Sequence, residues 1–363
     1  MGPGGRFGEG GLFGYLCVPV KLPRISIVTP SFNQGPYIEQ TIRSVIDQGY
    51  PNLEYIVIDG GSTDGTVAVL KKYEKHLAYW VSEPDRGQSD AINKGLAVAT
   101  GEVFNWLNSD DLLAEGSLAR IGSYFAAHPG VDVLCGYCRI FDGPTGATVR
   151  QDRMGIRRNA EETLLEPGVN QPSTFFRLRT VRELGGINDH FRYVMDLELW
   201  MRYLLANDLH RVRTTDDLLS HFRLHGASKT VGSSSPMQAE ELHLYQSLVN
   251  AAGLPAHVLA WVHRTYQRTD GPALRPELIA RISRKSRQRL ARYLVARYLS
   301  KFSNQVPAAD VREALRYYYR NGGTPANRPL LKTAVKAFLL PAGVLNAYRG
   351  LKRRLQPGAK PAP

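Results

Sequence analysis

Two adjacent carboxylates, Asp110 and Asp111, follow an apolar, strand-like run over residues 102–107. Burying such charges is costly unless a cation or a hydrogen-bond donor meets them, so packing alone does not explain the pair. Carboxylate oxygens at the end of a strand suit Mg²⁺ or Mn²⁺ that carries a substrate diphosphate. Helix capping is the alternative, because either aspartate could cap a helix over residues 114–127. The pair alone leaves both interpretations open.

The elements before this pair alternate between short β-prone runs and helical patterns. Strands are expected at 25–29, 53–58, 77–81 and 102–107, and helices at 36–46, 64–74 and 89–99. This series predicts an α/β fold with a doubly wound, mostly parallel sheet. Polar loops follow the four strands, at residues 29–33, 59–65, 83–88 and 108–111. Since the carboxyl ends of parallel strands share one edge of a sheet, these loops are expected to converge on one ligand crevice.

Two charged residues in these loops allow alternative interpretations. Asp59 closes an apolar strand ahead of two glycines, where its carboxylate could bind a base N–H or a ribose hydroxyl. It could instead close an Asx-turn onto the backbone of Ser62 or Thr63. Arg86 could neutralise a diphosphate or hold a nucleobase, and an ordinary surface arginine is the competing interpretation.

Beyond residue 130 the pattern is less regular. A strand or hairpin is expected at 131–141 with its return at 147–151, a short strand at 171–176 and a short helix at 179–184. A helix is expected to start near Asp196 and to pack Trp200 inward. Asp196 could cap this helix, and a cap at a crevice can also serve as a base. A strand at 219–230 that leaves the domain carries His225, and a lone histidine is more often structural than a ligand.

Charge is distributed unevenly along the chain. Residues 235–363 hold 22 Lys and Arg against 6 Asp and Glu, a formal charge of +16, whereas residues 1–234 hold 24 basic and 27 acidic residues. After residues 233–236 the pattern is helical, at 240–251, 256–268, 275–300, 308–320, 330–340 and 344–355, and the last of these helices is basic and amphipathic. Such a tail is expected to bind an anionic membrane surface, nucleic acid or an acidic polymer, unless its helices are merely solvated.

These patterns predict a flexible segment over residues 1–22, a catalytic domain over 23–232 and a basic α-helical region over 236–363. No run approaches the ~18 apolar residues of a membrane span, and the first residues do not resemble a signal peptide. A cytoplasmic protein is therefore expected, with peripheral attachment to the cytoplasmic face of a membrane through the tail as an option. Cys17, Cys135 and Cys138 are too few for a disulfide framework, and Cys135 and Cys138 are expected to be structural thiols.

The run from about Arg24 to Thr230 resembles a family 2 glycosyltransferase with the GT-A fold. The resemblance rests on TPSFN at 29–33, DGGSTDGT at 59–66, EPDRGQSDAINKG at 83–95, WLNSDD at 106–111, QPSTFF at 171–176, MDLELW at 195–200 with Arg202, and RLH at 223–225 followed by SKT at 228–230. It implies transfer of a sugar from a nucleotide-diphospho sugar to a hydroxyl of a glycan or lipid-linked acceptor, with inversion at the anomeric carbon. Assembly of a cell-envelope polysaccharide or glycolipid is the process that it suggests.

The resemblance also implies roles for individual residues. Asp196 would be the general base, and Asp110 and His225 would hold Mg²⁺ or Mn²⁺. The nucleotide sugar would be bound by Thr29, Pro30, Ser31, Asp59, Arg86, Gln88, Asp90, Asn93, Asn108, Ser109, Asp111, Trp200 and Arg202. Asn108 stands where the usual Asp-x-Asp motif has its first aspartate, so the metal is expected to rest on Asp110, with Asp111 as a further candidate.

Two other function classes stay open at this point. A nucleotidyltransferase forming nucleotide sugars could share this sheet, although residues 29–36 contain no Lys or Arg for the phosphate-binding loop that it would need. A nucleic-acid-binding protein is indicated only by the charge of the tail, and no specific nucleic-acid motif is present.

Overall fold

A computed structural model of the chain describes residues 21–165, 167–226, 228, 234–251, 284–302 and 307–323, together with residues 256, 333, 338, 339, 341 and 344. The predicted N-terminal segment and the predicted helices at 256–268, 330–340 and 344–355 lie almost wholly outside the described residues.

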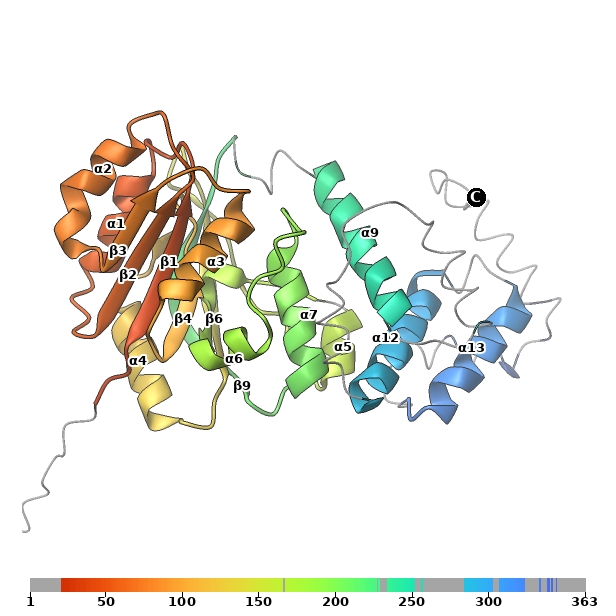
Figure 1. The fold of residues 1–363 in the computed structure, drawn as a ribbon. Coiled ribbons are helices and arrows are strands. Elements are labelled where there is room, and N and C mark those ends of the chain that lie inside the picture. Colours follow the sequence, from red (N-terminus) through yellow and green to blue (C-terminus); the bar gives the residue numbers. More distant parts are fainter. Residues whose placement is uncertain are drawn as a thin grey trace, which may run out of the picture.

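The described chain forms a nine-stranded sheet with helices on both of its faces, followed by a helical region (Figure 1). The strands are β1 Ile25–Ser31, β2 Leu53–Asp59, β3 Tyr79–Ser82, β4 Val103–Trp106, β5 Leu112–Leu113, β6 Val133–Asp142, β7 Thr148–Arg153, β8 Thr174–Arg177 and β9 Val212–Leu224. The helices beside the sheet are α1 Ile38–Ile46, α2 Thr66–Tyr73, α3 Gln88–Val98, α4 Ser117–Ala127, α5 Ala160–Leu165, α6 Leu178–Glu183 and α7 Met195–Asn207. The helical region consists of α9 Ser234–Ala251, α12 Arg284–Phe302 and α13 Ala308–Arg320.

The strand order is β3-β2-β1-β4-β8-β6-β9-β5, and β7 pairs with β6 outside this path. The first four strands are parallel, β8 runs against β4 and β6, and β9 runs parallel to β6. In the described sheet, β5, β7 and β8 therefore oppose the direction of the other six strands. The predicted mostly parallel sheet is confirmed.

Alternating side chains of the strands pack into two separate hydrophobic cores, one on each face of the sheet. Ile25 and Ile27 of β1 pack in one cluster with apolar residues of α1, α2 and α4. Val28 of the same strand packs in the other cluster with residues of α3, α6 and α7. Because successive side chains of a strand point to opposite faces, both faces of the sheet are covered, as a doubly wound fold requires.

Several predicted boundaries in the sheet are wrong, including the strand expected at 171–176, which starts only at Thr174. The first strand does not break at Pro30 but continues to Ser31, where its residues pair with Ile58 and Asp59 of β2. The missing N–H of Pro30 costs nothing, because it faces β4, and β4 pairs with β1 only as far as Val28. The strand expected to leave the domain is β9, which starts earlier, at Val212, and lies inside the sheet between β6 and β5.

The helical region packs against the helices beside the sheet and shares their core. The cluster that contains Val28 also contains Leu244 of α9, Leu294 of α12 and Leu315 of α13, all buried. Arg289 of α12 donates a 2.6 Å bond to Asp208, which follows α7. Within the described residues, none of the helices combines the length and the apolar character needed to cross a membrane.

Candidate functional site

A cavity of about 660 Å³ lies where the loops after β1, β2, β3 and β4 meet. The predicted convergence of these loops is confirmed. The cavity is lined by Pro30, Ser31, Phe32, Gln34, Gly60, Asp85, Arg86, Gly87, Gln88, Ser89, Ala91, Asn108, Ser109, Asp110, Asp189, Phe191, Arg192, Tyr193, Phe222 and Ser228. The predicted residues that line it are Pro30, Ser31, Arg86, Gln88, Asn108, Ser109 and Asp110.

The loops after β1 and β2 hold each other through local hydrogen bonds. Asn33, in the left-handed conformation with φ 52°, donates its N–H to Ser62 Oγ and accepts from the N–H of Thr63. The carboxylate of Asp64 accepts from the N–H groups of Gly35 and Thr66. These bonds fix the edge of the cavity before any ligand arrives, which lowers the ordering cost of binding.

Ser31 brings a hydroxyl to this edge. Its side chain is buried, and its Oγ has no hydrogen-bond partner among the residues that the structure describes. Buried polar atoms are normally satisfied, so an unpaired one that lines a cavity is suited to a polar ligand. Thr29 lies two residues earlier in the strand but is fully buried, and its Oγ1 is 3.1 Å from the hydroxyl of Tyr55.

Asp59 is buried and its carboxylate already accepts three bonds. They come from the N–H and Oγ of Ser62, at 2.8 and 2.5 Å, and from Ser82 Oγ at 2.6 Å. The Asx-turn interpretation therefore describes the geometry observed, and Asp59 does not line the cavity. A base or ribose would have to replace one of these bonds to reach the carboxylate.

Arg86 lines the cavity, and two carboxylates pair with its guanidinium. Its guanidinium lies 2.6 Å from Asp90 Oδ1 and 2.9 Å from Asp189 Oδ2. The hydrogen bond to Asp90, followed by the charges of both carboxylates, raises the pKa of Arg86. Arg86 thus ties the start of α3 to the segment before α7, and Asp90 serves as its anchor rather than as part of the cavity wall.

A chain of polar contacts runs from the cavity into the loop after β4. Gln88 Nε2 donates to Asn108 Oδ1 at 2.6 Å, and Asn108 Nδ2 donates to Asp111 Oδ2 at 3.2 Å. Asp111 is buried, and its other oxygen accepts from the N–H of Arg223. Burial, followed by the charge of Asp110, raises the pKa of Asp111 well above its usual range. Asp111 holds the loop from within and does not line the cavity.

The helix-capping interpretation of the carboxylate pair is wrong. Helix α4 starts at Ser117 with Gly116 as its N-cap, and no side chain caps it. The two aspartates instead point in different directions, since Asp110 lines the cavity while Asp111 is buried beneath it.

Asp110, which lines the cavity, contacts the buried His225, which does not line it and comes from a distant part of the chain. His225 Nε2 is 2.9 Å from Asp110 Oδ2. The imidazole packs on Tyr37 with ring centroids 4.5 Å apart, and Arg223 Nε donates to the carbonyl of Asp110. The side-chain pair is thus supported from α1 and β9 together.

The donor set at this point is small. Among the described residues no group of three or more His, Cys, Asp and Glu side chains could hold a metal ion. One carboxylate and one imidazole nonetheless fit a divalent ion whose remaining ligands are water and substrate phosphates, which is how Mg²⁺ is commonly held. The residues present therefore fit a metal that binds together with a diphosphate.

Asp196 lies at the start of α7, directly after the segment that lines the cavity. It is half-buried and its Oδ1 accepts from the N–H of Leu197 at 2.8 Å. The N-cap of the helix is Val194, so the predicted capping role of Asp196 is wrong in position. A carboxylate in the first turn is still favoured by the helix dipole.

Three predicted donor-binding residues occupy structural positions instead. Trp200 is buried and stacks on Tyr203 with centroids 5.6 Å apart. Arg202 is buried, pairs with Glu198 at 2.6 Å and donates to two backbone carbonyls before α7. Asn93 exchanges two bonds with the backbone of Ile187. Arg202 thus ties α7 to the turn before it, Asn93 ties the following segment to α3, and Trp200 packs in the core.

The segment from Asp189 to Tyr193 is the part of the cavity wall that sequence reasoning missed. Gly185 and Gly186, both with positive φ, turn the chain toward it, and the carbonyl of Phe191 accepts from Ser89 Oγ on α3. The glycine pair is the signal that was visible in the sequence. The pair predicts a turn, but it does not predict that the segment after the turn lines the cavity.

Comparison with known proteins agrees with this geometry. Residues 26–185 match the family model described as Glycosyl transferase family 2. An uncharacterized glycosyltransferase of Mycobacterium tuberculosis is 32% identical over 199 residues, which are 51% of this chain and 70% of that protein. TuaG of Bacillus subtilis, named for teichuronic acid biosynthesis, is 44% identical over 103 residues, 27% of this chain and 40% of that protein.

The fold is also similar to a solved structure. Residues 1–349 of S. aureus TarS in complex with UDP-GlcNAc align with a TM-score of 0.52 at 16% identity, covering 92% of each chain. The same region in complex with UDP aligns with a TM-score of 0.51 at 18% identity, again over 92% of each chain. At these identities the likeness concerns the fold, which is of the GT-A type, including the helical region after the sheet.

Proposed function

The chain belongs to glycosyltransferase family 2, and from this we propose that it transfers a sugar from a nucleotide-diphospho sugar to an acceptor hydroxyl, with inversion at the anomeric carbon. The observation that carries the proposal is the contact of Asp110, which lines the cavity formed by the four strand-end loops, with the buried His225. With a divalent ion held by Asp110 and His225, and with the unpaired hydroxyl of Ser31, this cavity would suit a ligand that combines phosphate charge with many hydroxyls.

In the proposed reaction, the donor lies in the cavity with its diphosphate toward Asp110 and His225. A divalent ion bound there would supply charge that stabilises the leaving diphosphate. Ser31, Gln88 and Asn108 would bind the nucleotide and the sugar through hydrogen bonds. Arg86 would add positive charge near the diphosphate, to the extent that it is released from Asp90 and Asp189.

Asp196 is proposed as the base on the acceptor side. Its carboxylate takes the proton of the acceptor hydroxyl while the acceptor oxygen bonds to the anomeric carbon. The bond from that carbon to the diphosphate oxygen breaks at the same time, and the nucleoside diphosphate leaves with the electron pair. Attack from the side opposite the leaving group inverts the anomeric carbon, and a positioned carboxylate is suited to this step.

The process served is proposed to be assembly of a cell-envelope polysaccharide or glycolipid. TuaG is named for teichuronic acid biosynthesis, and TarS has been solved with UDP-GlcNAc. A UDP-sugar is therefore the first donor to test, and a glycan or lipid-linked hydroxyl the first kind of acceptor.

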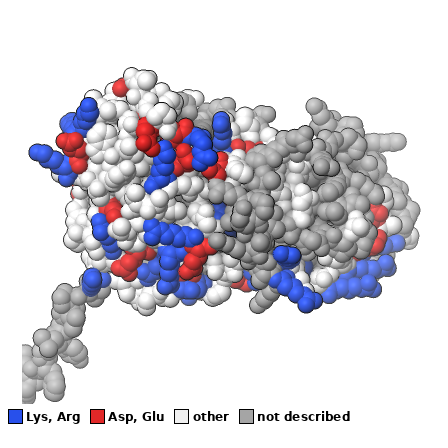
Figure 2. Space-filling view, in the orientation of Figure 1, with Lys and Arg blue, Asp and Glu red and all other residues white. Residues whose placement is uncertain are grey.

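We also propose that the basic helical region holds the enzyme at an anionic membrane surface. In the view of Figure 2, Lys and Arg side chains gather along the lower edge of this region. Arg284 and Arg287 of α12 and Arg316 and Arg320 of α13 are exposed. Exposed basic residues near an anionic bilayer contribute about 1 kcal/mol each, so four would favour the surface.

A binding panel tests the catalytic proposal. The melting temperature is measured with UDP, GDP and dTDP, each with and without Mn²⁺, and hydrolysis of UDP-GlcNAc and of a GDP- and a dTDP-sugar is followed. Metal-dependent stabilisation by one nucleotide and slow release of that nucleotide from its sugar are expected. A nucleotidyltransferase would instead form a nucleotide sugar from a nucleoside triphosphate and a sugar phosphate, and a nucleic-acid-binding protein would respond to none of these nucleotides.

A further inference from the structure

We propose that Glu240, in the C-terminal helical region, is a positioning residue that holds the acceptor side of the cavity in place. The inference rests on the proposed function, because it concerns how the proposed base is positioned. It assigns to the helical region a direct part in building the site.

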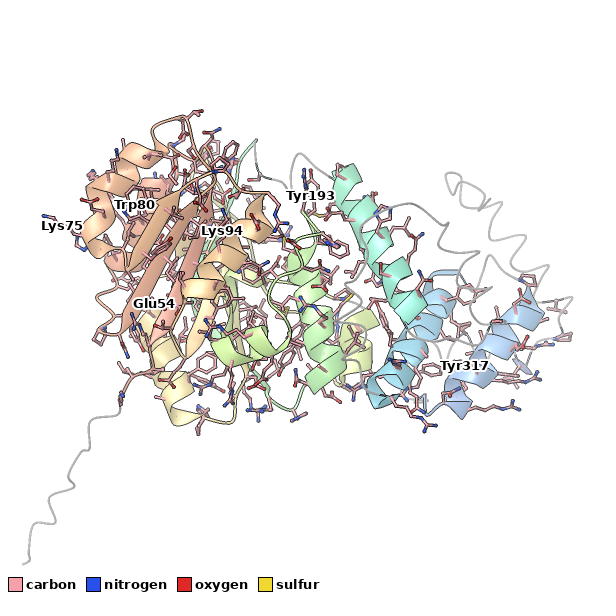
Figure 3. The ribbon with its side chains drawn as sticks, in the orientation of Figure 1. Glu54, Lys75, Trp80, Lys94, Tyr193 and Tyr317 are labelled. Carbon is pink, nitrogen blue, oxygen red and sulfur yellow. The ribbon has the colours of Figure 1, made fainter. Side chains whose placement is uncertain are left out.

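The contact is made by one carboxylate and three successive backbone N–H groups. Glu240 lies on α9 and accepts from the N–H of Arg192 at 2.8 and 3.0 Å, of Tyr193 at 2.7 Å and of Val194 at 3.2 Å. These residues lead directly into α7. Figure 3 places Tyr193 beside the upper end of α9, above α7.

The position explains why a carboxylate is needed there. The N–H groups of Arg192 and Tyr193 precede α7 and that of Val194 is at its N-cap, so the helix supplies no carbonyl for any of them, and the N-cap offers no side-chain bond. Successive N–H groups that converge form a small site for an anion, and the N-terminus of the helix adds positive potential. Glu240 fills this site from 46 residues further along the chain.

The residues that Glu240 fixes belong to the cavity. Arg192 and Tyr193 line it, and Asp196 follows Val194 by two residues in the first turn of α7. The part of the segment before Arg192 is anchored elsewhere, since Asn93 and Ser89 of α3 bind the backbone of Ile187 and Phe191. The cavity wall is therefore held from the sheet side up to Phe191 and from α9 after it.

The neighbouring glutamate makes a different contact and supplies a matched control. Glu241 accepts from Arg297 of α12 at 2.9 Å, a bond that lies within the helical region. Replacing Glu241 weakens the packing of α9 on α12 and leaves the bonds to Arg192–Val194 in place. Comparing the two positions separates loss of positioning from general loosening of α9.

The test uses the full chain with UDP-GlcNAc, measuring UDP release, UDP affinity and melting temperature. Glu240→Gln is expected to lower kcat about tenfold to a hundredfold with KM and UDP affinity unchanged, since small displacements of a catalytic group cost up to about that factor. Glu241→Gln is expected to keep the parental kcat. Amide hydrogen exchange at Arg192–Val194 should quicken in Glu240→Gln and not in Glu241→Gln.

Parental kcat in a folded Glu240→Gln variant would overturn the inference, as would an equal loss in Glu241→Gln. If the parent neither binds UDP nor turns over any donor in the panel, the proposed function fails on its own. Amide exchange then still decides whether Glu240 fixes the segment, because it does not depend on activity: unchanged exchange in Glu240→Gln would refute the link.

Discussion

The imidazole of His225 lies against the carboxylate of Asp110, with Nε2 and Oδ2 2.9 Å apart, although the two residues are 115 positions apart in the chain. The contact joins the end of β9 to the loop after β4. Arg223 strengthens the junction, because its side chain binds the carbonyl of Asp110 and its N–H binds Asp111. The proposed metal site thus depends on a strand that enters the sheet after most of the domain is complete.

Replacing Asp110 by alanine is expected to abolish the Mn²⁺-dependent part of the UDP-induced rise in melting temperature, because the carboxylate is the charged ligand of the proposed site. His225→Ala should reduce it. Asp216→Ala removes an exposed carboxylate that pairs with Arg153 and should behave like the parent. If Asp110→Ala binds UDP and Mn²⁺ as the parent does, the metal lies elsewhere.

Asp196→Asn is expected to keep UDP affinity and to lower turnover by about 10²–10⁴-fold, the usual contribution of a positioned general base. Asp208→Asn provides the comparison at the other end of the same helix, where Asp208 binds Arg289. Its turnover should stay near that of the parent. Near-parental turnover by a folded Asp196→Asn variant would remove Asp196 from the reaction.

Arg202→Met is expected to destabilise the fold rather than to weaken donor binding. Glu198 is fully buried and would be left without its charged partner, which typically costs about 3–5 kcal/mol. Chemical denaturation measures the loss, and the double variant Glu198→Leu/Arg202→Met should recover part of it. Lower UDP affinity at parental stability would return Arg202 to the donor site.

The thiols of Cys135 and Cys138 are expected to be inert in the native protein. Burial raises the pKa of both to about 12, so at about pH 8 very little thiolate is present and thiolate is the reactive form. A thiol-reactive chromophore applied to Cys17→Ser should react only after unfolding in guanidinium. Prompt labelling of the folded variant would show that the sheet around β6 opens easily.

The full chain is expected to sediment with vesicles that contain anionic lipid and not with neutral vesicles, because the exposed arginines of α12 and α13 and the basic residues at 344–355 together carry the attraction. Raising the salt concentration should release it, since exposed charges are screened. A variant without residues 342–363 should bind more weakly. Equal binding to neutral and anionic vesicles, or no effect of the deletion, would rule out the membrane proposal.

The first half of the fold was predictable because each element there carries a local pattern. Apolar runs such as Leu53–Ile58 and helical spacing such as Ile38, Ile42 and Val45 are visible without knowledge of the partner, and both cores confirm them. β5 has two residues and exists only through its pairing with β9, so no local pattern reveals it. The polar first half of β9 hides that strand in the same way.

The site, like the fold, was predictable only in part. Residues at the ends of the parallel strands, such as Ser31, Asn108 and Asp110, were brought together by topology alone. The sequence could not show whether a polar side chain faces a ligand or a neighbouring backbone, and Asp59, Asn93 and Arg202 face backbone or side-chain partners. Glu240 was invisible as well, because its partners are N–H groups, which every residue but proline carries.

Because Glu240 binds the segment before α7, two parts of the cavity are held by different regions of the chain. The loops after the first four strands, the last of which contains Asp110, form one part of the cavity. Helix α9 holds the other part, which contains Arg192 and Tyr193. A substitution in the helices can therefore shift the second part without touching the first. If Arg192 and Tyr193 form the proposed acceptor side, such a substitution would change the acceptor and leave the choice of nucleotide intact.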